Sequence, residues 1–427
     1  MKGPVGIGVM GTGYWGSKLI DEYKAAEQNN RNVRLLKVCD PSSSALQACK
    51  HRFSLDDSLL TQNPNDVFED SEVSGVHIAT PNRTHYALAR SAIESGKNAL
   101  IEKPMTLKSR DAYQLTDLAF SRDLVLHVGH IFRHNAALQA AKHALERDAV
   151  GKVYYARVQW TDYTPPFHDR DIVFDLGPHP VDILNLLLGA WPTQASGIGR
   201  AYRSSREEDE VAYIIAEFQG DLFAHIELSW LHPSKHRDVS IVGSDGALLI
   251  DCINQRVVRF SNGDKFELPV IPNNTIKSEI EAFVQSISNH SVTMESGQIG
   301  AHTVEVLETI TESMWDRPLP PIKQYKADQT TALTAVLEMA RQNICALRCG
   351  MKDCLASEQM MKNPKLQKYL DSLINSNFLK AISTKEGTKL EVTEDGMRFL
   401  REYQEIEPSL DLIEQNRTLK KTTTEIN

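Results

Sequence analysis

The chain has 427 residues, of which 41% are hydrophobic and 24% charged, a composition that excludes collagen-like, coiled-coil and largely disordered proteins. Its length predicts two to three domains, and its six cysteines are too few for a disulfide scaffold and fit a reducing compartment. The formal net charge of −9 leaves no overall positive field that would attract nucleic acid or anionic lipid.

The first residues, MKGPVGIGVM, lead directly into a strand-like pattern without the charged and apolar segments of a signal peptide. The strongest apolar stretch, Ile183–Trp191, is far shorter than the roughly 20 residues of a membrane span. We therefore expect a cytoplasmic protein without membrane association.

Short β-branched runs alternate with segments of helical spacing over residues 1–126. The predicted strands are Val5–Val9, Val33–Val38, Gly75–Ala79, Asn98–Ile101 and Val125–Val128, and the predicted helices are Gly16–Ala26, Tyr86–Ser95 and Ser109–Ser121. This alternation is typical of βαβ units, so we expect an α/β domain with a doubly wound parallel sheet covered on both faces.

The pattern changes in residues 127–318, where strands separated by turn signals predominate. We predict strands at Val153–Trp160, Val211–Phe218, Leu222–Trp230, Val239–Val242 and Ala247–Asp251, and helices at Pro180–Leu188, Ile276–Ser288 and Gln298–Met314. This unit is expected to be an α+β domain with an open, mainly antiparallel sheet.

Prolines at 318, 320 and 321 among polar residues indicate a linker, which we place at residues 319–330. Residues 331–427 form a third predicted unit. Its expected elements are helices at Thr331–Arg348, Lys365–Asn375 and Glu394–Glu405, with Thr393 as an N-cap, and a strand pair at Leu379–Ile382 and Lys389–Val392.

A glycine pattern of the form G-x-G-x-x-G follows the first predicted strand and opens the first predicted helix. Its glycines are Gly11, Gly13 and Gly16, and Asp40 ends the next strand. Strand, tight turn, helix N-terminus and acid together are what a dinucleotide-binding fold requires. Asp40 would bind ribose hydroxyls and repel a 2′-phosphate, so we infer NAD rather than NADP. The alternative is a strand–turn–helix whose glycines serve packing only.

Two further segments could carry the reaction. Lys103 follows a predicted strand, which places it at the carboxyl edge of the parallel sheet where ligands bind. Asp175 and His179 are four residues apart across a Gly-Pro turn, and a histidine near a carboxylate suits proton transfer close to neutral pH. Alternatively, Lys103 is a solvated surface charge, Asp175 caps the helix and His179 packs in the core. A favourable interaction with the helix dipole explains Asp182 at least as well as a role in the reaction does.

These motifs, in this order, resemble the Gfo/Idh/MocA oxidoreductases from about residue 4 to residue 316. The matching segments are GTGYWG at 11–16, VCDP at 38–41, Thr80-Pro81-Asn82 with His85, GKNALIEKP at 96–104 and DLGPHPVD at 175–182. VGHIFRHNAAL at 128–138 and SWLHPSKHR at 229–237 further resemble the branch of nucleotide-sugar dehydrogenases, including UDP-N-acetylglucosamine 3-dehydrogenases, with His134 and Ala136 replacing the usual Phe and Pro.

The resemblance implies a role for each matching residue. His179 would accept the proton of a sugar hydroxyl, Asp175 would orient His179, and Lys103 would stabilise the developing alkoxide. The implied NAD-binding residues are Gly11, Gly13, Tyr14, Trp15, Gly16, Asp40, Thr80, Pro81, Asn82, His85 and Glu102. The implied substrate-binding residues are Lys103, His130, Arg133, His179, Lys235 and Arg237. Alternatively, Lys235 and Arg237 belong to a solvent-exposed face of the sheet and bind no substrate.

The third unit resembles small archaeal winged-helix domains through KYLDSLINSNFL at 368–379 and LEVTEDGMRFLREY at 390–403. Asn377 stands where glycine is usual and is the next best residue for a left-handed cap. Because acids and bases roughly balance past residue 330, docking or dimerisation is favoured over DNA contact. Cys345, Cys349 and Cys354 match no zinc spacing and are read as structural thiols.

We therefore expect an NAD-dependent sugar or nucleotide-sugar dehydrogenase with no metal site. The alternative is a non-catalytic or redox-sensing regulator that acts through the winged helix, and a third possibility is glycosidic cleavage that begins with transient oxidation. Family precedent implies a homodimer or homotetramer formed through the sheet of the second domain.

Overall fold

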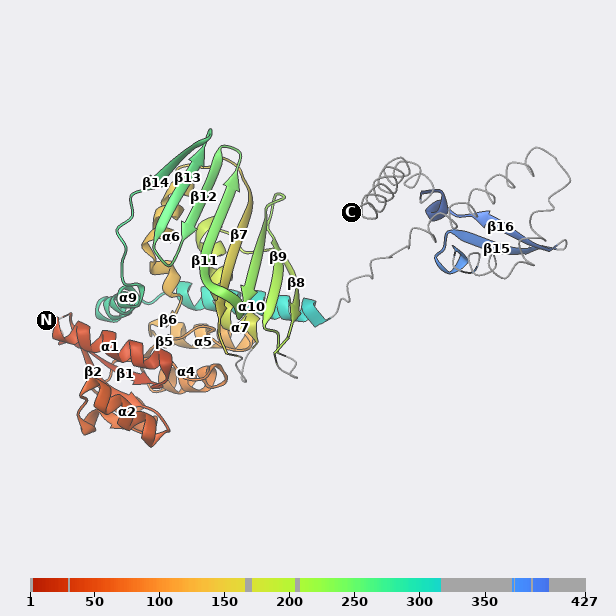
Figure 1. The fold of residues 1–427 in the computed structure, drawn as a ribbon. Helices are drawn as coiled ribbons and strands as arrows, with labels where there is room; N and C mark the ends of the chain where they lie inside the picture. Colours follow the sequence, from red (N-terminus) through yellow and green to blue (C-terminus); the bar gives the residue numbers. More distant parts are fainter. Residues whose placement is uncertain are drawn as a thin grey trace, which may run out of the picture. The chain divides into compact units, whose positions relative to one another are not determined.

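The computed structural model describes residues 3–29, 31–165, 171–203, 208–315, 371, 373–384 and 387–398. The chain divides into two compact units, residues 1–318 and 319–427 (Figure 1). Among the helices that the structure describes, none is long and apolar enough to cross a lipid bilayer.

A six-stranded parallel sheet begins the first unit, with the strand order β3-β2-β1-β4-β5-β6. Its strands are β1 (Val5–Met10), β2 (Val33–Cys39), β3 (Leu60–Thr61), β4 (Gly75–Ile78), β5 (Asn98–Ile101) and β6 (Leu126–Val128). Strand order reverses between β1 and β4, so the carboxyl ends of these two strands flank the crevice in which ligands of this fold bind. All six residues of β1 are buried, as a central strand covered on both faces requires.

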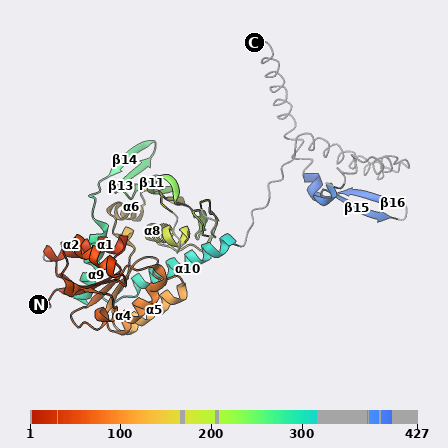
Figure 2. The same cartoon turned by 60° about the horizontal axis from the view of Figure 1, so that its bottom comes forward.

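Helices cover both faces of this sheet (Figures 1 and 2). On one face, α1 (Tyr14–Gln28), α2 (Ser43–Phe53) and α9 (Thr275–Asn289) share a core with residues of β1 and β2. On the other face, α4 (His85–Glu94), α5 (Ser109–Ser121) and α10 (Glu295–Trp315) pack on β4, β5 and β6. Two helices from late in the chain, α9 and α10, therefore complete the N-terminal domain.

The second sheet has eight strands in the order β14-β13-β12-β11-β7-β10-β9-β8. They are β7 (Val153–Tyr163), β8 (Gln194–Arg200), β9 (Val211–Glu217), β10 (Phe223–Ser229), β11 (Leu231–Gly243), β12 (Gly246–Asp251), β13 (Arg256–Ser261) and β14 (Asp264–Leu268). Neighbouring strands are antiparallel except β7 and β10, which pair in parallel. The sheet is therefore mixed.

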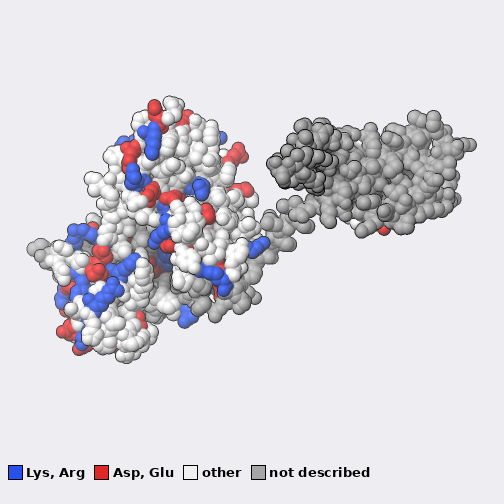
Figure 3. Space-filling model, in the orientation of Figure 1, with Lys and Arg blue, Asp and Glu red and all other residues white. Residues whose placement is uncertain are grey.

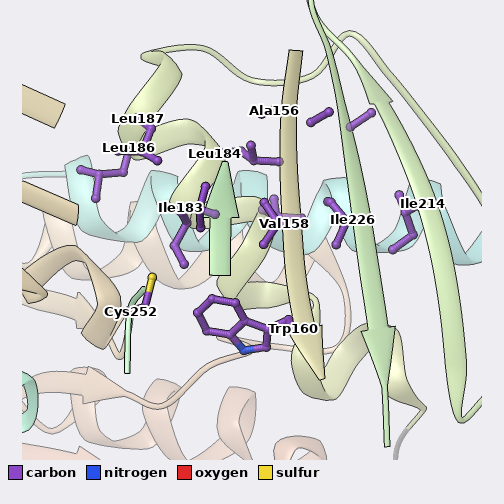
Figure 4. Packing of buried hydrophobic residues seen from close by; sticks show 14 of the residues in the cluster. Ala156, Val158, Trp160, Ile183, Leu184, Leu186, Leu187, Ile214, Ile226 and Cys252 are labelled. Atoms are coloured by element: carbon purple, nitrogen blue, oxygen red, sulfur yellow. The ribbon is translucent and has the colours of Figure 1, made fainter. Parts of the chain in front are cut away.

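The inner face of this sheet carries the largest core of the molecule. Val158 and Trp160 of β7 and Ile226 of β10 pack against Ile183 and Leu184 of α8 (Pro178–Leu188), as Figure 4 shows. The core also includes residues of α6 (Ala136–Glu146), α7 (Ile172–Leu176) and α10.

The outer face of the same sheet has no covering helix in the described part of the chain (Figure 1). Residues alternate strictly along β9, where inward residues are buried and Tyr213 and Ile215 point outward. Tyr155 stacks on Phe223 of the parallel neighbour with ring centroids 5.8 Å apart. An apolar strip thus lies on an otherwise polar face.

On the side of the first unit seen in Figure 3, acidic and basic residues are interspersed.

In the second unit, β15 (Leu379–Thr384) and β16 (Gly387–Val392) form an antiparallel hairpin. Helical residues 373–375 precede it and 394–398 follow it. Asn377 has a left-handed φ of 59°, and the Gly396 amide donates to Thr393 Oγ1 at 3.1 Å, so the predicted αL position and N-cap are both present. The predicted helix Thr331–Arg348 and the three cysteines 345, 349 and 354 lie outside the described residues.

The sequence predicted most of these elements but not all their limits. α1 begins at Tyr14 rather than Gly16, because Gly13 is the N-cap. The short predicted strand Val239–Val242 is the end of the 13-residue β11, whose register shifts between Leu231 and His236.

Candidate active site

The glycine loop joins β1 to α1 and has the geometry of a phosphate-binding turn. Gly11 has a φ of +93°, and a Cβ there would clash with the Ala79 carbonyl. A Cβ at Gly16 would clash with the Gly11 carbonyl, so these two glycines are required by the fold itself. A Cβ at Gly13 would meet no protein atom within 4 Å. Among the described residues nothing demands glycine at Gly13, whereas close approach of a pyrophosphate does.

Asp40 directly follows β2 and is hydrogen-bonded to this loop. Its carboxylate accepts hydrogen bonds from the Thr12 amide at 2.9 Å and the Thr12 hydroxyl at 2.8 Å. Its other oxygen accepts from the Ser42 amide at 2.9 Å. The acid is therefore fixed beside the glycine loop, where a dinucleotide fold places the adenosine ribose.

The start of α1 and the loop after β4 supply the other predicted cofactor residues. Tyr14 is 80% exposed, with Lys18 Nζ 4.4 Å from its ring centroid. The buried Asn82 amide nitrogen has no hydrogen-bond partner among the described residues, so it has a donor left for a ligand. Both ring nitrogens of His85 lie within hydrogen-bond distance of carbonyls, those of Pro104 and Thr80, which fixes the loop around Pro81.

Lys103 follows β5 at the carboxyl edge of the parallel sheet and reaches the second domain. Its Nζ donates to the Asp175 carbonyl at 2.8 Å. The Asp175 carboxylate in turn accepts from Trp230 Nε1 at 3.1 Å. The two segments that the sequence singled out, 96–104 and 175–182, therefore meet, although they come from different domains.

His179 lies on the first turn of α8 in an aromatic setting. Its ring is 5.0 Å from Phe132 and 5.6 Å from Trp160, centroid to centroid. Burial lowers the pKa of His179 well below its ordinary value, and the positive charges of Lys103 and Arg237 lower it further. His179 is therefore neutral near pH 7. The orienting role of Asp175 toward His179 stays a prediction.

His130 and Arg133 lie beside α8. Arg133 donates to the Asp182 carboxylate at 2.5 Å and to Asn185 Oδ1 at 2.7 Å. His130 Nδ1 is 3.8 Å from Asp182, and neither of its ring nitrogens has a hydrogen-bond partner among the described residues. Asp182 thus anchors Arg133 and lies near His130, instead of only complementing the helix dipole.

The two predicted cations of β11 have different surroundings. Arg237 is buried, donates to the Thr161 carbonyl at 2.6 Å and lies over the Trp160 ring, 5.0 Å from its centroid. Lys235 is largely exposed, 3.5 Å from the Asp162 carboxylate. Only Lys235 presents its charge to solvent.

The structure also shows a buried polar network that sequence reasoning missed. Trp15 Nε1 donates to Glu102 Oε1, and His77 Nε2 lies 3.4 Å from the same oxygen. Glu279 of α9 is beside them, and burial together with the negative charges of Glu102 and Asp182 raises its pKa well above the usual range. No sequence motif joins β4, β5 and α9, so only the fold reveals this cluster.

Comparison with known families gives two matches in the first unit. Residues 5–130 match the model described as the oxidoreductase family with an NAD-binding Rossmann fold, named GFO_IDH_MocA. Residues 138–249 match the C-terminal domain model of the same family.

Individual relatives share low sequence identity with this chain. The chain is 27% identical over 310 residues to UDP-N-acetylglucosamine 3-dehydrogenase of Acidithiobacillus ferrooxidans, covering 69% of this chain and 92% of that protein. It is 26% identical to scyllo-inositol 2-dehydrogenase (NAD(+)) of Bacillus subtilis, over 56% of this chain and 73% of the relative. A crystal structure of an oxidoreductase from Agrobacterium radiobacter in complex with NAD+, L-tartaric acid and magnesium has the same fold, with a TM-score of 0.65, 19% identity and coverage of 73% and 96%.

Proposed function

Because this chain belongs to the Gfo/Idh/MocA oxidoreductase family, which binds NAD through its Rossmann domain, we propose that it oxidises a hydroxyl group of a sugar or nucleotide-sugar. The observation that carries the proposal is the meeting of Lys103 with the segment of His179 at the carboxyl edge of the parallel sheet. An ammonium and a neutral imidazole from different domains then face one space, as removal of a proton and a hydride from a CH–OH group requires.

In the proposed reaction an imidazole nitrogen of His179 accepts the hydroxyl proton. The pKa of His179 supports this role, because burial and the neighbouring positive charges keep the ring neutral. Contacts with Phe132 and Trp160 hold the plane of the ring. The base is thus both available and oriented before the substrate arrives.

Lys103 binds the same hydroxyl oxygen and stabilises the negative charge that develops on it. Its hydrogen bond to the Asp175 carbonyl orients the ammonium toward the segment that carries His179. Asp175 is itself held by Trp230, so the proposed catalytic group is tied to the second sheet.

NAD, when bound, supplies the hydride acceptor for this chemistry. The residues present fit it: α1 has no side-chain acceptor at its N-cap, Gly13 leaves room for a pyrophosphate, Asp40 suits ribose hydroxyls, and the Asn82 amide has a donor left over. Tyr14, Trp15, Thr80 and Glu102 complete the proposed cofactor site.

We place the sugar against His130 and Arg133; Asp182 and Asn185 fix Arg133, and the ring nitrogens of His130 have no hydrogen-bond partner among the described residues. The exposed Lys235 could then neutralise a phosphate of a nucleotide-sugar, while the buried Arg237 supports Trp160 behind His179. Similarity to a UDP-N-acetylglucosamine 3-dehydrogenase favours a nucleotide-sugar over a free sugar.

The uncovered outer face of the second sheet supports a homo-oligomer. The pairing register places Ile215, His225, Arg157, Ser240 and Leu249 in one row across five strands, so the face mixes apolar and charged groups. A mixed surface of this kind suits a second copy of the chain, because a twofold interface needs one self-complementary patch.

The second unit keeps the regulatory alternative open. Helical residues 373–375, the hairpin β15–β16 and helical residues 394–398 follow the order of a winged helix. DNA binding by this unit would appear as a salt-dependent affinity that responds to NAD, and no binding at low salt excludes the regulator.

The proposed reaction is tested with the full chain, NAD and a panel of UDP-sugars, following NADH by absorbance. Lys103→Ala and His179→Ala should bind NAD normally but turn over at least about a hundredfold more slowly. The exposed residues Lys108 and His143 provide matched controls as alanine variants. Undiminished turnover of either site variant would overturn the assignment, and analysis of the sugar product separates net oxidation from glycosidic cleavage.

A further inference from the structure

Three side chains of the kinds that bind metals meet in the interior, and Trp15 of the glycine motif contacts one of them. His77 comes from β4, Glu102 follows β5 and Glu279 comes from α9, and their relative exposures are 0%, 6% and 2%. One donor atom from each of the three lies within 4.8 Å of the other two. Three separate elements thus present a histidine and two carboxylates to a single point.

The first two ligands are held as metal ligands usually are. Tyr23 lies 3.1 Å from His77 Nδ1, which leaves Nε2 directed at Glu102. Trp15 donates to Glu102 Oε1 and fixes that carboxylate. Partners of this kind orient the ligands of metal sites and are found behind most metal-binding histidines.

The surroundings of Glu279 give independent evidence that its carboxylate binds a positively charged partner. Neither of its carboxylate oxygens has a hydrogen-bond partner among the described residues, although the side chain is 98% buried. The charged groups that act on it, Glu102 and Asp182, are both negative. A buried carboxylate among other carboxylates is costly unless a positive charge offsets it.

The spacing suits a small divalent ion. Three atoms no more than 4.8 Å apart leave a point within about 2.8 Å of each, and zinc bonds to nitrogen and oxygen are about 2.0–2.2 Å. The His77 Nε2–Glu102 Oε1 distance of 3.4 Å already matches the edge of a tetrahedron of such bonds. Side-chain movements below about 1 Å would therefore close the site.

We propose that His77, Glu102 and Glu279 bind one Zn²⁺ ion. Imidazole with carboxylates is a donor set that zinc accepts, and the second oxygen of Glu279 can fill a further position. The ion ties α9 to the carboxyl edge of the parallel sheet, directly beside Lys103. The ion is not a reactant in the proposed oxidation. Because Glu102 also belongs to the proposed cofactor site, the tests measure zinc content and thermal stability rather than activity.

The test is the metal content of the full-length protein, purified without chelator or after incubation with Zn²⁺ and desalting. We expect about one equivalent of zinc per chain, retained on dilution, and a melting temperature that falls when a strong chelator removes the ion. Replacement by Co²⁺ should give the visible absorption of a four-coordinate site.

Glu279→Gln keeps the shape of the side chain and removes its charge. It should lower the zinc content at least about tenfold and make the melting temperature insensitive to chelator. Glu281→Gln, on the same helix but paired with Arg31, is the matched control and should bind zinc normally. If Glu279→Gln fails to fold, His77→Gln and the Co²⁺ spectrum of the unaltered protein give the same answer.

Two results would overturn the proposal. One is a protein that takes up no zinc or cobalt at any concentration tested. The other is a Glu279→Gln variant as stable as the unaltered protein with and without chelator, which would show that Glu279 is simply a protonated acid.

Discussion

The charged groups that lower the pKa of His179, the proposed base, lie far from it in the sequence. Its pKa is lowered first by burial and then by the charges of Lys103 and Arg237. Because the neutral ring is the form that accepts a proton, a lowered pKa extends activity toward acid. An unperturbed histidine would lose activity as the pH falls through about 6.5.

The pH profile of kcat/KM for sugar oxidation tests this. We expect the acid limb to lie well below pH 6.5, and Arg237→Gln to move it up by about half a pH unit, because loss of a positive charge raises the pKa of His179. Lys235→Gln is the control: it removes a neighbouring charge that does not act on His179. An unmoved limb in Arg237→Gln would contradict the electrostatic account.

Asp40 supports a second prediction at the residue scale, which concerns the choice between NAD and NADP. Its carboxylate is fixed beside the glycine loop by Thr12 and Ser42, so it would oppose a 2′-phosphate at close range. Asp40→Ser should raise the ratio of kcat/KM for NADP to that for NAD at least about tenfold. The exposed Asp21→Ser on α1 should leave the ratio unchanged, and the same result for Asp40→Ser would show that the carboxylate does not select the cofactor.

At the scale of elements, the glycine loop separates fold from function. Gly11→Ala forces a left-handed φ on alanine and a clash with the Ala79 carbonyl, which should cost about 1–3 kcal/mol or more of unfolding free energy. Gly13→Ala meets no protein atom, so its unfolding free energy should change by less than about 1 kcal/mol while the Kd for NAD rises at least about tenfold. Denaturant unfolding measures the unfolding free energy of each variant, and NAD titration measures the Kd for NAD. Normal NAD binding by Gly13→Ala would place the pyrophosphate elsewhere.

Sequence pattern predicted the elements whose burial is regular and missed those whose burial is not. β5 and α5 were predicted to the residue, because a short buried strand and an amphipathic helix have clear signatures. β8 was missed: its sequence QASGIGR has two glycines, and its residues are only partly buried or exposed. α6 is an exception: it has a regular buried face, and the motif at 128–138 covers only its first three residues, so the sequence analysis did not predict it.

At the scale of the whole molecule, the motifs identified the parts of the site but not their partners. The G-x-G-x-x-G pattern, Lys103 and the 175–182 segment carry local signals, and the fold brings them to one edge of the sheet. Trp230 and Asp182 stand in matching segments, but neither segment indicates that Trp230 binds Asp175 or that Asp182 binds Arg133, and Glu279 beside Glu102 has no sequence signal. These pairs join residues far apart in the chain, so they follow from tertiary structure alone.

The outer face of the second sheet sets the last expectation, which concerns assembly. Tyr213, Ile215 and Phe223 project from it and are each 41–44% exposed in a single chain. A stable interface buries about 800 Å² per partner with an apolar centre, and a lysine there would be desolvated without a partner. Ile215→Lys combined with Phe223→Lys should therefore convert a dimer or tetramer into smaller species in light scattering, with NAD binding intact. Phe120→Lys, at a residue that is 51% exposed on α5, should leave the mass unchanged; an oligomer that survives the double substitution uses another surface.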